Sequence, residues 1–140
     1  CFEVTETTAI RDMKLAEELM TDLRSRGVTF ALDDFGTGLS SFSYLQQLPL
    51  DILKIDGSFV REIVHDDVAH TMVRAINDVG QSMGLVTVAE FVSSEEIAAE
   101  LVNMGVDYGQ GYSLAEPLPL DDYLNSLSVS FSSSDQSKIA

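Results

Sequence analysis

Apolar residues along this chain follow two different spacings. Short continuous apolar runs predict buried strands, and longer stretches with apolar residues every three or four positions predict amphipathic helices. Strands are expected at residues 1–5, 28–32, 51–55, 85–89 and 106–108. Helices are expected from residue 7 or 8 until Gly27 stops the first of them, and then at residues 40–48, 67–83, 94–104 and 120–127.

Strands that alternate with helices in this way predict parallel βα units. The polar residues that could carry chemistry fall at the carboxyl ends of the predicted strands, where β/α barrels and open parallel sheets place their sites. A complete barrel typically has about 250 residues, whereas this chain has 140. The sequence therefore predicts an α/β fold that is part of a TIM-like (β/α) barrel, formed by residues 1–125, and a flexible Ser-rich tail at residues 126–140.

Composition indicates which partners and which cellular compartment to expect. Hydrophobic residues make up 45% of the chain, which is typical of a globular domain. The net charge of −15 argues against a nucleic-acid polymer, because such surfaces need clustered Lys and Arg. No apolar run approaches the roughly 20 residues that span a bilayer, so no membrane segment is expected in this chain. The single cysteine, Cys1, excludes an internal disulfide and favours a reducing, cytoplasmic location.

Two adjacent carboxylates, Asp33 and Asp34, directly follow the second predicted strand. Such a pair is tolerated if a cation lies between the two groups or if one of them is protonated. Gly36 and Gly38 then allow a sharp turn and a close approach of the backbone to a ligand. From these residues alone, a metal site and a helix cap with a solvated neighbour both remain open.

Five short motifs follow one another at the predicted strand ends. They are Phe2-Glu3-Val4-Thr5-Glu6, Asp33-Asp34-Phe35-Gly36-Thr37-Gly38, Leu53-Lys54-Ile55-Asp56, Ala89-Glu90 and Gln110-Gly111-Tyr112. This order resembles the C-terminal half of the EAL domain, a bacterial phosphodiesterase family, from Cys1 to about Tyr123. The resemblance implies a TIM-like barrel that hydrolyses cyclic di-GMP to the linear dinucleotide pGpG with two Mg²⁺ or Mn²⁺ ions.

The resemblance also implies the metal ligands. Glu3 matches a metal-binding glutamate, and Asp33 matches the carboxylate that bridges the two metals. Asp34 and Glu90 match ligands of the second metal, and Glu90 is also a candidate general base. These oxygen ligands suit Mg²⁺ or Mn²⁺.

Three further residues receive roles from the same resemblance. Lys54 matches the lysine that holds the attacking water, and Gln110 matches a polar residue that steadies the site. Glu6 matches a glutamate that anchors the loop after Asp34.

The match also departs from the family pattern. The Glu-Ala-Leu glutamate and a later asparagine ligand are expected upstream of Cys1, so this chain is expected to be part of a longer protein and weakly active or inactive alone. The usual Glu-Gly-Val-Glu-Thr sequence is here Glu90-Phe91-Val92-Ser93-Ser94. Phe91 is expected to narrow the site, and Ser93 is expected to form a capping box with Glu96.

Three classes of function remain to be compared. The first is an enzyme, and the second is a degenerate EAL domain that binds cyclic di-GMP without cleaving it, for which Ser93 is the main argument. The third is a receiver domain, whose lysine lies after two further strands, whereas Lys54 lies only 20 residues after Asp34. We expect the longer protein to be a homodimer joined to sensor or GGDEF domains, which could also carry a membrane anchor.

Overall fold

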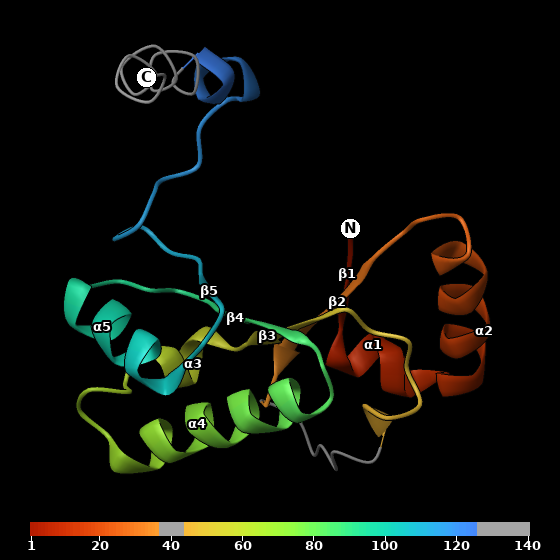
Figure 1. The fold of residues 1–140 in the computed structure, drawn as a ribbon, viewed down its shortest axis with the longest axis horizontal. Coiled ribbons are helices and arrows are strands. Elements are labelled where there is room, and N and C mark those ends of the chain that lie inside the picture. Colours follow the sequence, from red (N-terminus) through yellow and green to blue (C-terminus); the bar gives the residue numbers. More distant parts are fainter. Residues whose placement is uncertain (37–43, 126–140) are drawn as a thin grey trace, which may run out of the picture.

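The computed structural model describes residues 1–36 and 44–125. Its five strands form one parallel sheet (Figure 1), and they are β1 Phe2–Thr5, β2 Phe30–Phe35, β3 Ile52–Ile55, β4 Val86–Ala89 and β5 Tyr108–Gly109. The helices between them are α1 Glu6–Arg11, α2 Met13–Arg24, α3 Gly57–Val60, α4 Asp67–Ser82 and α5 Glu95–Met104. Residues 120–125 are also helical.

The strands lie in the sheet in the same order as in the sequence, β1-β2-β3-β4-β5, and every neighbouring pair is parallel. A doubly wound sheet reverses its strand order at a switch point, whereas a β/α barrel adds each strand beside the previous one. The described strands follow the second pattern. The predicted α/β fold with part of a barrel is therefore confirmed.

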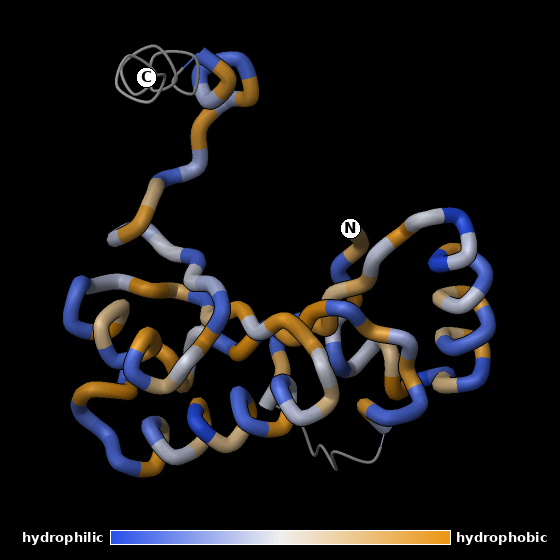
Figure 2. Tube along the Cα trace, in the orientation of Figure 1, coloured by the Kyte–Doolittle hydropathy of each residue, from blue (hydrophilic) through white to orange (hydrophobic). Residues whose placement is uncertain are grey.

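The core lies between this sheet and its helices, and the strand residues that face it are almost inaccessible. Leu32, Leu53 and Ile55 are each 0% exposed, and Figure 2 shows apolar segments along the strands and on the inner side of α4. Gly80 lets α4 approach the sheet closely, because a Cβ there would lie only 2.7 Å from Thr87 Cγ2. This packing holds β3 and β4 in fixed positions and so fixes the residues at their carboxyl ends.

The first predicted helix is in fact two helices that meet at Asp12. Asp12 has φ −147° and ψ 77°, and its carboxylate accepts a hydrogen bond of 3.2 Å from the Leu15 N–H at the start of α2. The apolar spacing continues through Asp12, so periodicity alone could not reveal the break. The short helix α3 was also not expected, because four residues are too few to show a helical period.

Two predicted boundaries near the site are wrong. Strand β2 does not end at Leu32 but continues to Phe35, so both aspartates belong to the strand. The cap of α5 is Ser94 rather than Ser93, since the Ser94 hydroxyl accepts the Ile97 N–H at 3.2 Å. Two consecutive serines leave this choice open in the sequence.

Some expectations lie outside the described residues. They include the loop from Thr37 onward, the start of the helix expected at residues 40–48, and the Ser-rich tail at 126–140. The end of that helix prediction, residues 44–48, forms a turn rather than an α-helix. In residues 1–36 and 44–125, every helix is too short or too polar to cross a membrane.

Candidate metal centre and active site

Strand β2 presents two consecutive carboxylates to the same site. In a regular strand Asp33 and Asp34 would point to opposite faces of the sheet. The pairing of β2 with β3 shifts register between Leu32 and Phe35, and Asp34 has φ 58°. Asp tolerates this left-handed conformation better than most residues, and such bulges redirect side chains. The irregularity therefore lets both aspartates face the residues at the ends of β3 and β4.

Lys54 on β3 joins carboxylates from three different strands. Its Nζ lies 2.6 Å from Glu90 Oε1, 2.8 Å from Asp33 Oδ1 and 3.2 Å from Glu3 Oε2. The lysine side chain is only 6% exposed, while the Glu3 side chain is 56% exposed. The parallel strands thus bring together residues that are 87 positions apart at the extremes, Glu3 and Glu90.

Burial and the neighbouring charges shift the pKa values of two groups at this site, Lys54 and Glu90. Burial by itself lowers the pKa of Lys54, but hydrogen bonds to Asp33 and Glu90 outweigh it, so the net pKa is raised and the lysine stays protonated. Burial raises the pKa of Glu90, and Lys54 opposes that rise only in part. Repulsion from Asp33 and Asp34 adds to the rise. The negative charges at the site therefore exceed what one ammonium group balances.

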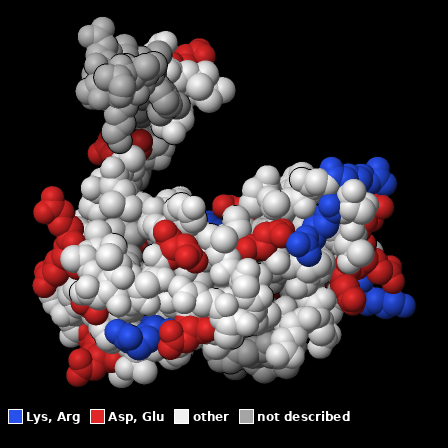
Figure 3. Space-filling model, in the orientation of Figure 1, with Lys and Arg blue, Asp and Glu red and all other residues white. Residues whose placement is uncertain are grey.

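Three of the carboxylates are close enough to hold one cation. One oxygen from each of Asp33, Asp34 and Glu90 lies within 4.8 Å of the other two. Carboxylate oxygens are the hard ligands that Mg²⁺ and Mn²⁺ prefer, so the residues present fit such an ion. Glu3 meets this group through Lys54 rather than directly. Figure 3 shows acidic side chains near the middle of this face of the molecule.

Glu6 connects α1 to the chain that follows the aspartates. The residue is only 3% exposed, and its Oε2 accepts a hydrogen bond of 3.4 Å from the Gly36 N–H. Gly36 has φ 104°, and a Cβ there would meet Phe59 and Ile76 at about 3 Å. Glycine is therefore required at this turn. The Glu6 carboxylate, at the start of α1, holds the backbone at this glycine.

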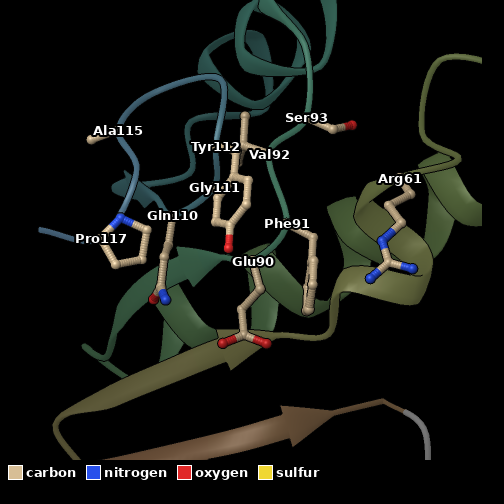
Figure 4. A pocket seen from close by; sticks show the side chains of 10 residues that line it. All are labelled: Arg61, Glu90, Phe91, Val92, Ser93, Gln110, Gly111, Tyr112, Ala115 and Pro117. Atoms are coloured by element: carbon tan, nitrogen blue, oxygen red, sulfur yellow. The ribbon is translucent and has the colours of Figure 1, made fainter.

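Gln110 lies at the side of an open cavity of about 480 Å³ next to the carboxylates. Figure 4 shows the Glu90 carboxylate at one end of this cavity, with Gln110 and Tyr112 beside it. The Gln110 backbone is held by the end of β4 and the loop after it, since its N–H donates to the Ala89 carbonyl and its carbonyl accepts from the Val92 N–H. Lys54, in contrast, does not line the cavity but lies behind Glu90 in the strand layer.

Arg61 also lines the cavity, and sequence reasoning missed it. It follows the unexpected helix α3, and its guanidinium carbon lies 4.1 Å from the centre of the Phe91 ring. No motif in the sequence contains Arg61, and only the three-dimensional fold brings it to the cavity.

Known proteins match both the sequence and the fold of this chain. The family model described as "EAL domain" matches residues 1–117, so the chain belongs to the EAL domain family. The cyclic di-GMP phosphodiesterase PdeB of Shewanella oneidensis is 46% identical over 123 residues, which cover 88% of this chain and 14% of PdeB.

Two solved structures have the same fold. The EAL domain of Mycobacterium smegmatis DcpA has a TM-score of 0.85 and 37% identity, over 92% of this chain and 58% of that one. The PaMucR phosphodiesterase in complex with c-di-GMP has a TM-score of 0.82 and 40% identity, over 86% of this chain and 49% of that one. The chain therefore spans about half of each solved domain and a small part of its curated relative.

Proposed function

We propose that this chain is part of a metal-dependent phosphodiesterase that hydrolyses cyclic di-GMP to linear pGpG. The observation that carries the proposal is the convergence of Asp33, Glu90 and Glu3 on Lys54, with Asp34 beside them. Family membership supports it, as do relatives whose names state this activity. Because the chain spans only a small part of PdeB, the activity is proposed for the longer protein that contains it.

In this proposal Asp33, Asp34 and Glu90 hold Mg²⁺ or Mn²⁺ ions, with Glu3 as a further ligand. Bound divalent ions lower the pKa of a bound water and neutralise negative charge that develops on a phosphate. The family resemblance makes Asp33 the candidate ligand of both ions, and its place within reach of both Asp34 and Glu90 supports that role.

The protein's own residues position the reaction. Lys54 remains charged, and its buried ammonium group can orient an attacking water and stabilise negative charge next to it. Glu90 is a candidate acceptor for the proton of that water, since burial raises the pKa of its carboxyl group. Gln110 steadies the side of the cavity, and Glu6 fixes the backbone just after the aspartates.

A second candidate is a domain that binds cyclic di-GMP without cleaving it. The observation in its favour is Ser93, which replaces a glutamate of the family pattern and is exposed next to the cavity. The retained carboxylates of β2 favour the enzyme, because a binding module has no need for a surplus of negative charge beside a phosphate ligand.

The remaining proposals concern the longer protein. The single cysteine is exposed and free, which fits a reducing, cytoplasmic location. Strand β1 lies at one end of the described sheet, and the apolar groove between it and helices α1 and α2 is suited to cover by further protein. We therefore retain a homodimer and attached sensor or GGDEF domains as expectations.

The test uses the longer protein with purified cyclic di-GMP. Chromatography of the products should show pGpG when Mg²⁺ or Mn²⁺ is present and no product after chelation. Tight binding of cyclic di-GMP without product in either Mg²⁺ or Mn²⁺ would refute the enzyme and support the binding module. Product formation that persists after complete chelation would refute the metal-dependent mechanism.

A further inference from the structure

The loop directly after Glu90 has a strained backbone. Phe91 has φ 53°, in the left-handed region that favours glycine. A residue with a side chain keeps such a conformation only where the surrounding structure fixes it firmly. Because Glu90 is both a proposed metal ligand and a candidate proton acceptor, the contacts that fix this loop also determine where its carboxylate lies.

The segment at residues 110–113 holds this loop from one side. The Val92 N–H donates to the Gln110 carbonyl at 3.0 Å, and the Gln110 N–H donates to the Ala89 carbonyl at 2.8 Å. A Cβ at Gly111 would overlap the Val92 backbone, so the two segments touch through their main chains. Figure 4 shows them running next to each other.

Ser113 adds a side-chain contact to the same loop. Its hydroxyl donates a hydrogen bond of 2.8 Å to the Val92 carbonyl, and its own N–H donates to that same oxygen at 3.2 Å. Two donors therefore occupy both lone pairs of this carbonyl and hold the peptide plane after Val92 in one orientation. The Val92 side chain is 0% exposed, so the residue is also anchored in the core.

Strand β3 holds the other end of the loop. The Glu90 N–H donates to the Ile55 carbonyl at 3.2 Å, and the Glu90 carboxylate lies 2.6 Å from Lys54 Nζ. Phe91 is thus the strained residue between two fixed points, Glu90 and Val92. A relaxation of its backbone would rotate the peptide groups on both sides and move Glu90, and the Ser113 hydroxyl opposes that rotation.

We infer that Ser113 is a positioning residue for Glu90, acting through the Val92 carbonyl and the strained backbone of Phe91. The inference rests on the proposed function, because it concerns a proposed ligand of the same site. The sequence gives no signal for it, since Ser113 lies just beyond the last of the five motifs. The structural alternative is that its hydroxyl stabilises only the turn at residues 112–114.

The experiment measures kcat and KM for cyclic di-GMP, and the Kd for Mn²⁺, in the longer protein. Ser113→Ala removes one neutral hydrogen bond, so kcat should fall and the Kd for Mn²⁺ should rise, each by about threefold to tenfold. KM should stay close to the parent value, because the lining of the cavity is unchanged. Ser113→Thr keeps a hydroxyl and should restore kcat and the Mn²⁺ affinity.

Ser82→Ala is the matched control. The Ser82 hydroxyl also donates to a backbone carbonyl at 2.8 Å, that of Val79, but it lies at the end of α4, far along the chain from Glu90 and near the amino end of β4. Both alanine variants lose the same kind of hydrogen bond, so their free energies of unfolding should fall by similar amounts. Only Ser113→Ala should lose turnover and Mn²⁺ affinity.

The outcomes separate the two proposals. If Ser113→Ala loses stability as Ser82→Ala does but keeps the parent's kcat and Mn²⁺ affinity, the positioning role is overturned and the phosphodiesterase proposal stands. A Ser113→Thr variant as impaired as Ser113→Ala would also overturn the role, because the hydroxyl would not be the cause. A parent that binds Mn²⁺ without turnover refutes only the enzyme, and the Mn²⁺ affinities of the same variants then decide the role of Ser113. A parent with neither turnover nor Mn²⁺ binding refutes both.

Discussion

Two buried polar groups in this domain differ in how their charges and hydrogen bonds balance. Around Thr87, donors and acceptors match: the hydroxyl donates to Asn77 Oδ1 at 2.7 Å, its backbone N–H donates to Asp107 at 2.8 Å, and the Asn77 amide donates to the Met104 carbonyl at 3.0 Å. Around Lys54, three carboxylates share one ammonium group and Asp34 adds a fourth negative charge nearby.

The difference indicates that the Thr87 network stabilises the fold, whereas the Lys54 cluster is suited to bind a ligand. A balanced network rigidifies the link between α4, α5 and β4 and has no unmet demand for a ligand. An unbalanced cluster of carboxylates costs stability unless a cation completes it. We therefore expect changes around Thr87 to alter folding, and changes around Lys54 to alter metal binding and turnover.

The largest expected effect is the loss of activity in Asp33→Asn. Removal of one charge from the group proposed to bind the cations should lower turnover by more than about 100-fold, because even outer-shell changes at metal sites cost about 10–100-fold. Steady-state product formation in the longer protein measures this. Asp78→Asn on the exposed side of α4 is the control and should retain full activity. Normal turnover in Asp33→Asn would exclude it as a metal ligand.

The next largest effect distinguishes the contribution of Lys54 to turnover from the contribution of the metal ions. Lys54→Met removes the ammonium group but leaves every carboxylate, so it should lower kcat by about 100-fold, the lower end of the loss found when one preorganised donor is removed. The affinity for Mn²⁺ should stay the same or increase, because the competing positive charge is gone. Calorimetric titration checks this, and a large loss of Mn²⁺ affinity would show that Lys54 organises the ligands instead.

Substitutions in the balanced network around Thr87 should lower the free energy of unfolding rather than the activity. Asn77→Ala leaves the Thr87 hydroxyl and the Met104 carbonyl without their buried partner, which should cost about 1–3 kcal/mol of unfolding free energy. Denaturant unfolding measures it. Asn103→Ala on the surface of α5 is the control and should change stability by less than about 0.5 kcal/mol. A variant that loses Mn²⁺ binding without loss of stability would break the comparison.

The smallest expected effect is a pH dependence of stability that arises where His70 on α4 contacts Glu100 on α5. A hydrogen bond of 2.9 Å from His70 lowers the pKa of Glu100 in the folded protein. A lowered pKa means that the folded state binds fewer protons, so this stabilisation is present above the ordinary value of 4.5 and is lost as the pH falls through the folded pKa. The melting temperatures of the parent and Glu100→Gln should therefore converge in acid. A difference that does not change with pH would contradict this coupling.

Much of this account could be predicted from the sequence, and the missing parts have physical causes. Alternating apolar runs gave the parallel βα units, and the order of short motifs pointed to Lys54 and its carboxylates. The bulge that turns Asp34 toward Asp33 depends on backbone dihedrals that no residue pattern encodes. Arg61 meets Phe91 only because a four-residue helix places it there, and helices of that length carry no detectable period.

The central claim is that the surplus of negative charge around Lys54 exists to hold divalent cations. Thermal unfolding of the longer protein with increasing Mn²⁺ tests it most directly, because a ligand that binds only the folded state adds about 2.7 kcal/mol at 100 times its Kd. The parent and Asn77→Ala should gain the same stabilisation, and Asp33→Asn should gain little or none. Equal stabilisation of Asp33→Asn by Mn²⁺ would contradict the claim.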